Sequence, residues 1–154
     1  MKRALACNRG AAAVEFALTA SIFFTLLFAI IEFSRLMLLW GTASEATRMA
    51  ARMASVCSPG AITEQAVRKR VASLLNASGQ VSINGRTDWL SLTYLPSGCT
   101  ESTCTLVTAR IANVSAKVSI PGVQQTIILP DFSASSPREA MLSTINSTQN
   151  NACI

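Results

Sequence analysis

The sequence contains no histidine. This absence removes the side chain that most often serves as a general base, as a metal ligand or as a switch near neutral pH. Charged residues make up only 14% of the 154 residues, and no glycine-rich phosphate loop, nucleophile elbow or paired-carboxylate motif is visible. We therefore expect no catalytic residues, no cofactor and no metal site, and a protein that is not an enzyme.

Positive charge is also scarce once the N-terminus is set aside. The formal net charge is +5, but Lys2, Arg3 and Arg9 contribute three of these charges. The basic run at residues 68–70 is interpreted as a solvated helix face, with anionic headgroups or a neighbouring subunit as the functional alternative. A surface that binds nucleic acid is therefore not expected.

One long apolar run near the N-terminus dominates the sequence. Residues 16–31 carry no charge and lie between Glu15 and Glu32. Together with residues 11–14 they are just long enough to cross a bilayer. Because the basic residues precede this run, the positive-inside rule places the N-terminus in the cytoplasm and the rest of the chain on the other side of the membrane.

Helical periodicity continues beyond the apolar run. Apolar and small residues recur every three or four positions up to Cys57, which predicts one long helix that is amphipathic in its second half. Ser58, Pro59 and Gly60 end it, and a second helix is expected over about residues 62–76. Alternating residues predict strands at 90–94, 107–111, 114–120 and 126–129, with a bulge or turn near Asn113.

These elements predict an α+β fold. A long N-terminal helix over residues 11–57 would lie in the membrane over its first half, and residues 58–154 would form a head with the second helix and a small antiparallel sheet. The segment after Asp131 is rich in Ser, Thr and Asn, and is expected to be a loosely ordered polar tail.

Four of the five cysteines follow the apolar run. An even number of cysteines in an exported segment suits an oxidising compartment. Cys99 and Cys104 flank a turn-like segment between two predicted strands, so a disulfide across this loop is favoured, and Cys57 and Cys153 are then left to pair. All three connectivities remain open. A zinc site of four thiolates is the alternative, although no Cys-x-x-Cys pair is present.

The residues around the start of the apolar run allow three interpretations. They could form a cleaved secretory signal with its cleavage site near Ala43, or a signal anchor that stays uncut. The third follows from a short basic leader that ends in Gly10, then small residues, then Glu15 and Phe16. This stretch, NRGAAAVEFALTASIFFTLLFAIIEFSR, resembles the prepilin motif of the Tad (type IVc) pilus system and the N-terminus of TadE/TadF-like minor pseudopilins.

The resemblance, which is specific over residues 8 to about 56, implies a processing site and an assembly role. A prepilin peptidase would cut between Gly10 and Ala11, so that residues 1–10 form the leader. Glu15 would then pair with the new amine at Ala11 or with that of a neighbouring pilin.

The family also implies a location and partners. The protein would be anchored in the bacterial inner membrane with a periplasmic head, and could enter an extracellular pilus. Its partners would be membrane lipid, the prepilin peptidase, other Tad pilins and pseudopilins, and the pilus assembly machinery. The alternative is an unprocessed single-pass envelope protein whose exported domain binds a ligand or a protein partner. The residues do not decide between TadE, TadF and a relative.

Overall fold

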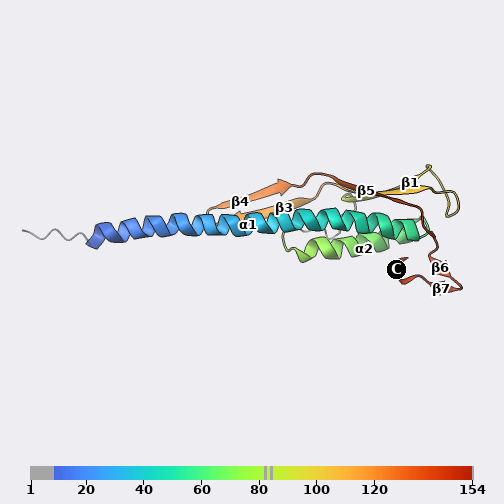
Figure 1. The fold of residues 1–154 in the computed structure, drawn as a ribbon, viewed down its shortest axis with the longest axis horizontal. Helices are drawn as coiled ribbons and strands as arrows, with labels where there is room; N and C mark the ends of the chain where they lie inside the picture. The colour runs from blue at the N-terminus through green and yellow to red at the C-terminus, as the bar shows by residue number, and fades with distance from the viewer. Residues whose placement is uncertain (1–8, 82, 84, 154) are drawn as a thin grey trace, which may run out of the picture.

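The computed structural model of the chain describes residues 9–81, 83 and 85–153. Most of the predicted leader, with Lys2, Arg3 and Cys7, therefore lies outside the described residues. A single long helix, α1, runs the length of the molecule, and the head is attached along its C-terminal part (Figure 1). Helix α1 spans Arg9–Val56, 48 residues, which makes it about 72 Å long at the usual rise per residue. The predicted continuation of the apolar helix into a rod is confirmed.

The head combines a second helix with antiparallel strands, so the predicted α+β class is confirmed. Helix α2 spans Ala61–Ala77 and packs against α1. The strands are β1 (Leu90–Leu95), β2 (Leu106–Ile111), β3 (Ser115–Ile120), β4 (Val123–Ile128), β5 (Phe132–Pro137), β6 (Thr144–Ile145) and β7 (Thr148–Gln149), followed by a 3-10 turn at Asn151–Cys153. Strands β1, β2 and β5 form one sheet in that order, whereas β3 pairs with β4 and β6 pairs with β7.

Asn113 marks the point where the chain leaves the three-stranded sheet. Its φ of 57° lies in the left-handed region, which asparagine tolerates better than most residues. The predicted turn near this residue is present, and it does more than restore a face: the chain begins the separate β3–β4 hairpin there.

The prediction of a loosely ordered segment after Asp131 was wrong for residues 132–137, which form β5. This segment reads FSASSP, and serine gives little intrinsic preference for a strand. Pairing with β2 stabilises it, because Phe132 lies opposite Ile111 and Ala134 opposite Ala109. The strand is therefore defined by a partner that is distant in the sequence.

The core lies between the second half of α1, α2 and the sheet. Along α1 the buried apolar residues begin at Leu39, and the next ones are mostly alanine, which lets neighbouring elements approach the helix backbone closely. Apart from Leu39, the largest side chains in this core come from outside α1: Trp89, Leu75, Ile83 and Ile111. The head is thus packed on the distal half of α1, and the N-terminal half extends beyond it.

Candidate membrane and assembly site

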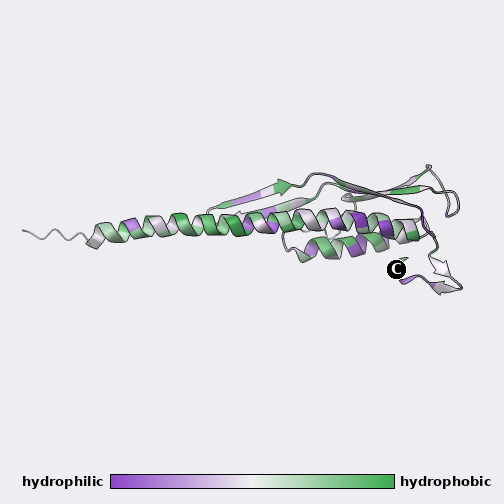
Figure 2. Ribbon diagram, viewed as in Figure 1, coloured by the Kyte–Doolittle hydropathy of each residue, from purple (hydrophilic) through white to green (hydrophobic). Residues whose placement is uncertain are grey.

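The N-terminal half of α1 is an apolar surface with little cover. Among the described residues, one helix, over Gly10–Val56, is long and apolar enough to cross a membrane, and none of its most apolar window is buried within the molecule. Phe16 is 75% exposed and Ile30 is 66% exposed. Figure 2 shows this part of α1 as mainly hydrophobic, whereas hydrophilic residues gather along the distal part. Soluble proteins rarely expose apolar patches of this extent, so this segment has the properties of a membrane anchor.

The predicted processing and assembly residues lie together at the start of α1. Gly10, Ala11, Glu15 and Phe16 are all exposed. A methyl group added at Gly10 would meet no other atom within 4 Å. Residues four apart in a helix share a face, so Ala11 and Glu15 lie one above the other.

The carboxylate of Glu15 has no partner within the described part of the chain. Its backbone carbonyl accepts a hydrogen bond from the Thr19 hydroxyl at 2.9 Å, but no hydrogen bond or ion pair of the carboxylate occurs among the described residues. Every other residue of α1 from Gly10 to Ile31 is uncharged. The charge of Glu15 is therefore not compensated within the described chain.

A second acidic residue, Glu32, connects α1 to the head. It is only 5% exposed although it directly follows the uncharged run. One carboxylate oxygen lies 3.2 Å from the Arg35 guanidinium. The other accepts hydrogen bonds from the Ser119 backbone N–H at 3.0 Å and from the Gln80 side-chain amide at 3.4 Å. Hydrogen bonds to a charged acceptor are stronger than neutral ones, so Glu32 holds β3 and the segment that follows α2 against the helix.

Sequence reasoning missed this role and treated Glu32 as the end of the uncharged run. The one local signal was Arg35, one turn farther along the same helix, because oppositely charged residues three apart can pair. Ser119 and Gln80 are 87 and 48 residues away from Glu32. No pattern within the sequence points to partners at that separation.

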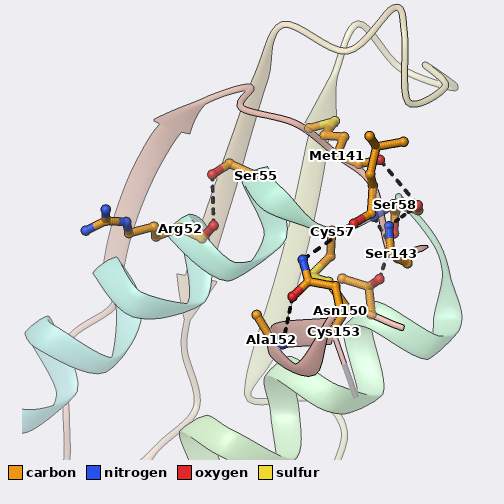
Figure 3. Close-up of a disulfide and its surroundings, with 11 residues drawn as sticks. Arg52, Ser55, Cys57, Ser58, Met141, Ser143, Asn150, Ala152 and Cys153 are labelled. Carbon is orange, nitrogen blue, oxygen red and sulfur yellow. Dashed lines mark hydrogen bonds between the residues drawn. A yellow bond between two sulfur atoms is a disulfide. The ribbon is translucent and has the colours of Figure 1, made fainter. Parts of the chain in front are cut away.

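At the other end of α1, a disulfide joins Cys57 to Cys153, with the two Cα atoms 5.6 Å apart (Figure 3). Next to it, Ser58 and Ser143 bond reciprocally: each backbone N–H donates to the other hydroxyl, at 3.0 and 3.1 Å. Figure 3 shows these two serines beside the sulfur atoms. The C-terminal segment is thus fastened to the point where α1 ends.

The same segment satisfies the last carbonyl groups of α1. The backbone N–H groups of Glu139 and Leu142 donate to the carbonyls of Ser55 and Val56, at 3.0 and 2.8 Å. A helix leaves its final carbonyls without partners inside the helix, and a buried helix end needs them from elsewhere. Residues far along the chain therefore act as the C-terminal cap.

The second disulfide, between Cys99 and Cys104, closes the loop that joins β1 to β2, with Cα atoms 4.9 Å apart. The Arg138 side chain donates to the Ser102 carbonyl in this loop. The structure thus contains the pairing that the sequence favoured among three. Within residues 9–81, 83 and 85–153, no group of three or more Cys, Asp or Glu side chains could hold a metal ion.

An apolar groove follows α1 just beyond the exposed span. It is lined by Met37, Leu38, Gly41, Thr42, Glu45, Ala46, Arg48, Met49, Arg52 and Leu74. Of these, Gly41 has nothing within 4 Å of the position that a side chain would take. The groove is therefore open to an approaching backbone.

Comparison with known protein families finds a match within α1. Residues 10–52 match the family model described as TadE-like protein. The matched segment belongs entirely to α1 and contains Gly10, Glu15 and Glu32. No curated protein and no solved structure matches the chain. The resemblance inferred from the residues around Gly10 is confirmed over this segment: residues 10–52, in the long N-terminal helix, are similar to TadE-like proteins.

Proposed function

We propose that the chain is a minor pilin or pseudopilin that takes part in the assembly of a Tad-type (type IVc) pilus after a prepilin peptidase cuts between Gly10 and Ala11. The match to TadE-like proteins and the exposed apolar helix support this proposal. In this proposal the first half of α1 lies in the inner membrane and the head lies in the periplasm. The three basic residues before the span support that orientation. The work of the subunit is assembly rather than catalysis.

The observation that carries the proposal is the uncompensated carboxylate of Glu15. An isolated charged side chain at the centre of a bilayer costs about 2.5 to 3.5 kcal/mol on insertion scales, and less near the interface. Cleavage before Ala11 would create an ammonium group one helical turn away. Two opposite charges are far less costly together than apart in a medium of low dielectric constant. Pairing within the helix or with the amine of a neighbouring pilin would neutralise both charges and favour the assembled state.

The groove beside the span supports packing against another pilin helix. It continues the exposed apolar face of α1 into the part of the helix beyond the membrane. Gly41 would allow the partner backbone to approach closely, as small residues do at helix contacts in membranes. Glu45 and Arg48 at its edge lie 3.8 Å apart and are both exposed, so they remain available to polar groups of a partner.

The processing step is tested by mass spectrometry of the protein extracted from membranes. We expect Ala11 as the first residue. Gly10→Val should block cleavage, because a peptidase site at the membrane must admit the backbone closely, whereas Ala13→Val, an exposed position nearby, should be cut normally. An intact N-terminus in the wild type would favour the unprocessed envelope protein, and a start near Ser44 would indicate a secretory signal.

The role of the charge is tested by Glu15→Gln, which keeps the shape and the hydrogen bonding of the side chain. We expect normal insertion and cleavage but a lower pilus yield and less crosslinking to other pilins. Glu101→Gln is the control, because Glu101 is an exposed acid in the loop between β1 and β2, outside both the apolar run and the groove. Normal pili with Glu15→Gln would show that the charge has no part in assembly.

A further inference from the structure

The β3–β4 hairpin is the part of the head that reaches farthest toward the N-terminal end of α1 (Figure 1). A hollow at its tip is lined by Phe28 of α1 and by residues 119–124 of the hairpin. Phe28 belongs to the uncharged run and precedes Glu32 by four residues, which corresponds to about 6 Å along the helix. In a bilayer spanned by residues 11–31, the hairpin tip therefore lies level with the last turn of the membrane segment.

The tip has the composition of an element that meets lipid. It reads Ile120, Pro121, Gly122 and Val123, without a charge, and Val123 is 57% exposed. Ile120 and Val123 pair with each other across the turn. Pro121 has no backbone N–H, and the φ of 87° at Gly122 closes the turn tightly. The turn thus presents few free hydrogen-bond donors, which matters because unsatisfied backbone groups are costly in lipid.

Two hydrogen bonds fix the height of the hairpin along α1. The Ser119 backbone N–H donates to Glu32 at 3.0 Å, and the Lys117 backbone N–H donates to the Gln80 carbonyl at 3.1 Å. The Lys117 side chain is exposed. It lies three residues from Ile120, a distance of about 10 Å along a strand. Along β3, from Ile120 at the tip to Lys117, the hairpin thus changes from apolar to cationic over a distance similar to the thickness of a headgroup layer.

We propose that the tip of the β3–β4 hairpin, residues 120–123, enters the headgroup layer of the bilayer beside α1, with Lys117 at the level of the lipid phosphates. The head would then contact lipid directly, in addition to its attachment through α1. This inference rests on the membrane insertion of α1 in the proposed function, but not on processing or on pilus assembly. The proposed partner of the hairpin tip is a phospholipid surface. The helix of a second subunit is the competing partner, and the test below distinguishes the two.

The test places the photoreactive residue p-benzoylphenylalanine at single positions of the full chain, reconstituted into vesicles of phosphatidylethanolamine and phosphatidylglycerol. Val123 is the test position, and Phe23, in the middle of the span, is the positive control. Ile128 is the matched negative control, because it is an exposed apolar residue of the same strand, about 16 Å farther from the tip. After irradiation, mass spectrometry of the adducts measures the lipid bound at each position.

We expect lipid adducts at Val123 and Phe23, with severalfold less at Ile128. Equal, low labelling at Val123 and Ile128, with Phe23 labelled, would overturn the proposal and leave the membrane span intact. Crosslinking of Val123 to a second protein chain in place of lipid would also overturn it. Absence of lipid adducts at Phe23 would contradict the membrane span itself and the hairpin contact with it.

Discussion

The two disulfides should differ in their contribution to the stability of the head. Cys57 and Cys153 are 96 residues apart in the sequence, whereas Cys99 and Cys104 are only 5 apart. A crosslink stabilises the folded state mainly by restricting the unfolded chain, and this effect grows with loop length. The chain-entropy relation gives about 4.7 kcal/mol for the longer loop and about 2 kcal/mol for the shorter one at 25 °C.

The surroundings of the longer disulfide point in the same direction. Both cysteines are buried, and the bond ties the C-terminal segment to the end of α1. The reciprocal bonds of Ser58 and Ser143 would keep the folded C-terminal segment in place after removal of the disulfide, so the loss of stability comes mainly from the greater freedom of the unfolded chain. We therefore expect Cys57→Ala with Cys153→Ala to lower the free energy of unfolding by roughly twice as much as Cys99→Ala with Cys104→Ala.

The assay is urea unfolding of the detergent-solubilised protein, followed by tryptophan fluorescence. Trp89 is 2% exposed in the core of the head. The second tryptophan, Trp40, lies beyond the uncharged run and packs against Phe132 of β5, so the emission reports on unfolding of the head rather than of the membrane segment. Reduction of the wild-type protein should shift the transition at least as far as either double substitution does. Equal losses in the two double variants, or a larger loss for the short loop, would refute the chain-entropy reasoning. Free thiols at these positions in protein from the cell envelope would refute the pairing itself.

Two further predictions concern α1. Glu32→Ala should loosen the attachment of the β3–β4 hairpin and lower the free energy of unfolding by about 2 to 4 kcal/mol, because it leaves the Ser119 N–H and the Gln80 amide without their charged acceptor. The rate of hydrogen exchange at the Ser119 amide should rise. In the control variant Glu45→Ala this rate should stay unchanged. Ala50→Leu should destabilise the head by about 1 to 3 kcal/mol, because Ala50 is fully buried between α1 and the head and a larger side chain would overpack this site. An unchanged midpoint of urea unfolding would show that the helix can shift to make room.

Helix α1 could be predicted from the sequence because its signals are local and repeated. The uncharged run, the spacing of Ala43, Ala46, Ala50 and Ala54, and the breakers after Cys57 all lie within the helix or beside it. The same holds for α2, whose buried residues Val67, Val71 and Leu75 recur every four positions. Hydrophobic periodicity is the strongest signal that a single sequence contains.

Strand β5 and the partners of Glu32 could not be predicted, because their cause lies elsewhere in the chain. Phe132 and Ala134 are stabilised by residues of β2 that precede them by more than twenty positions, and their own segment is half serine. The buried state of Glu32 depends on Ser119 and Gln80. Pairings of this kind are decided by tertiary packing, which outweighs local preference.

Glu15 and Glu32, the two acids that bracket the uncharged run, show why position along the sequence does not reveal the role of a charge. Glu32 has three partners in the fold, so its charge is compensated in the isolated subunit and it fixes the height of the head on α1. Glu15 has none among the described residues, and in the proposed function its compensation comes from the amine that processing would create or from another subunit. If both acids had been satisfied within the chain, the helix would gain nothing electrostatically from neighbours in the membrane. The proposed assembly role therefore depends on the difference between the two sites, and exchanging Glu15 for Gln removes that difference without altering the head.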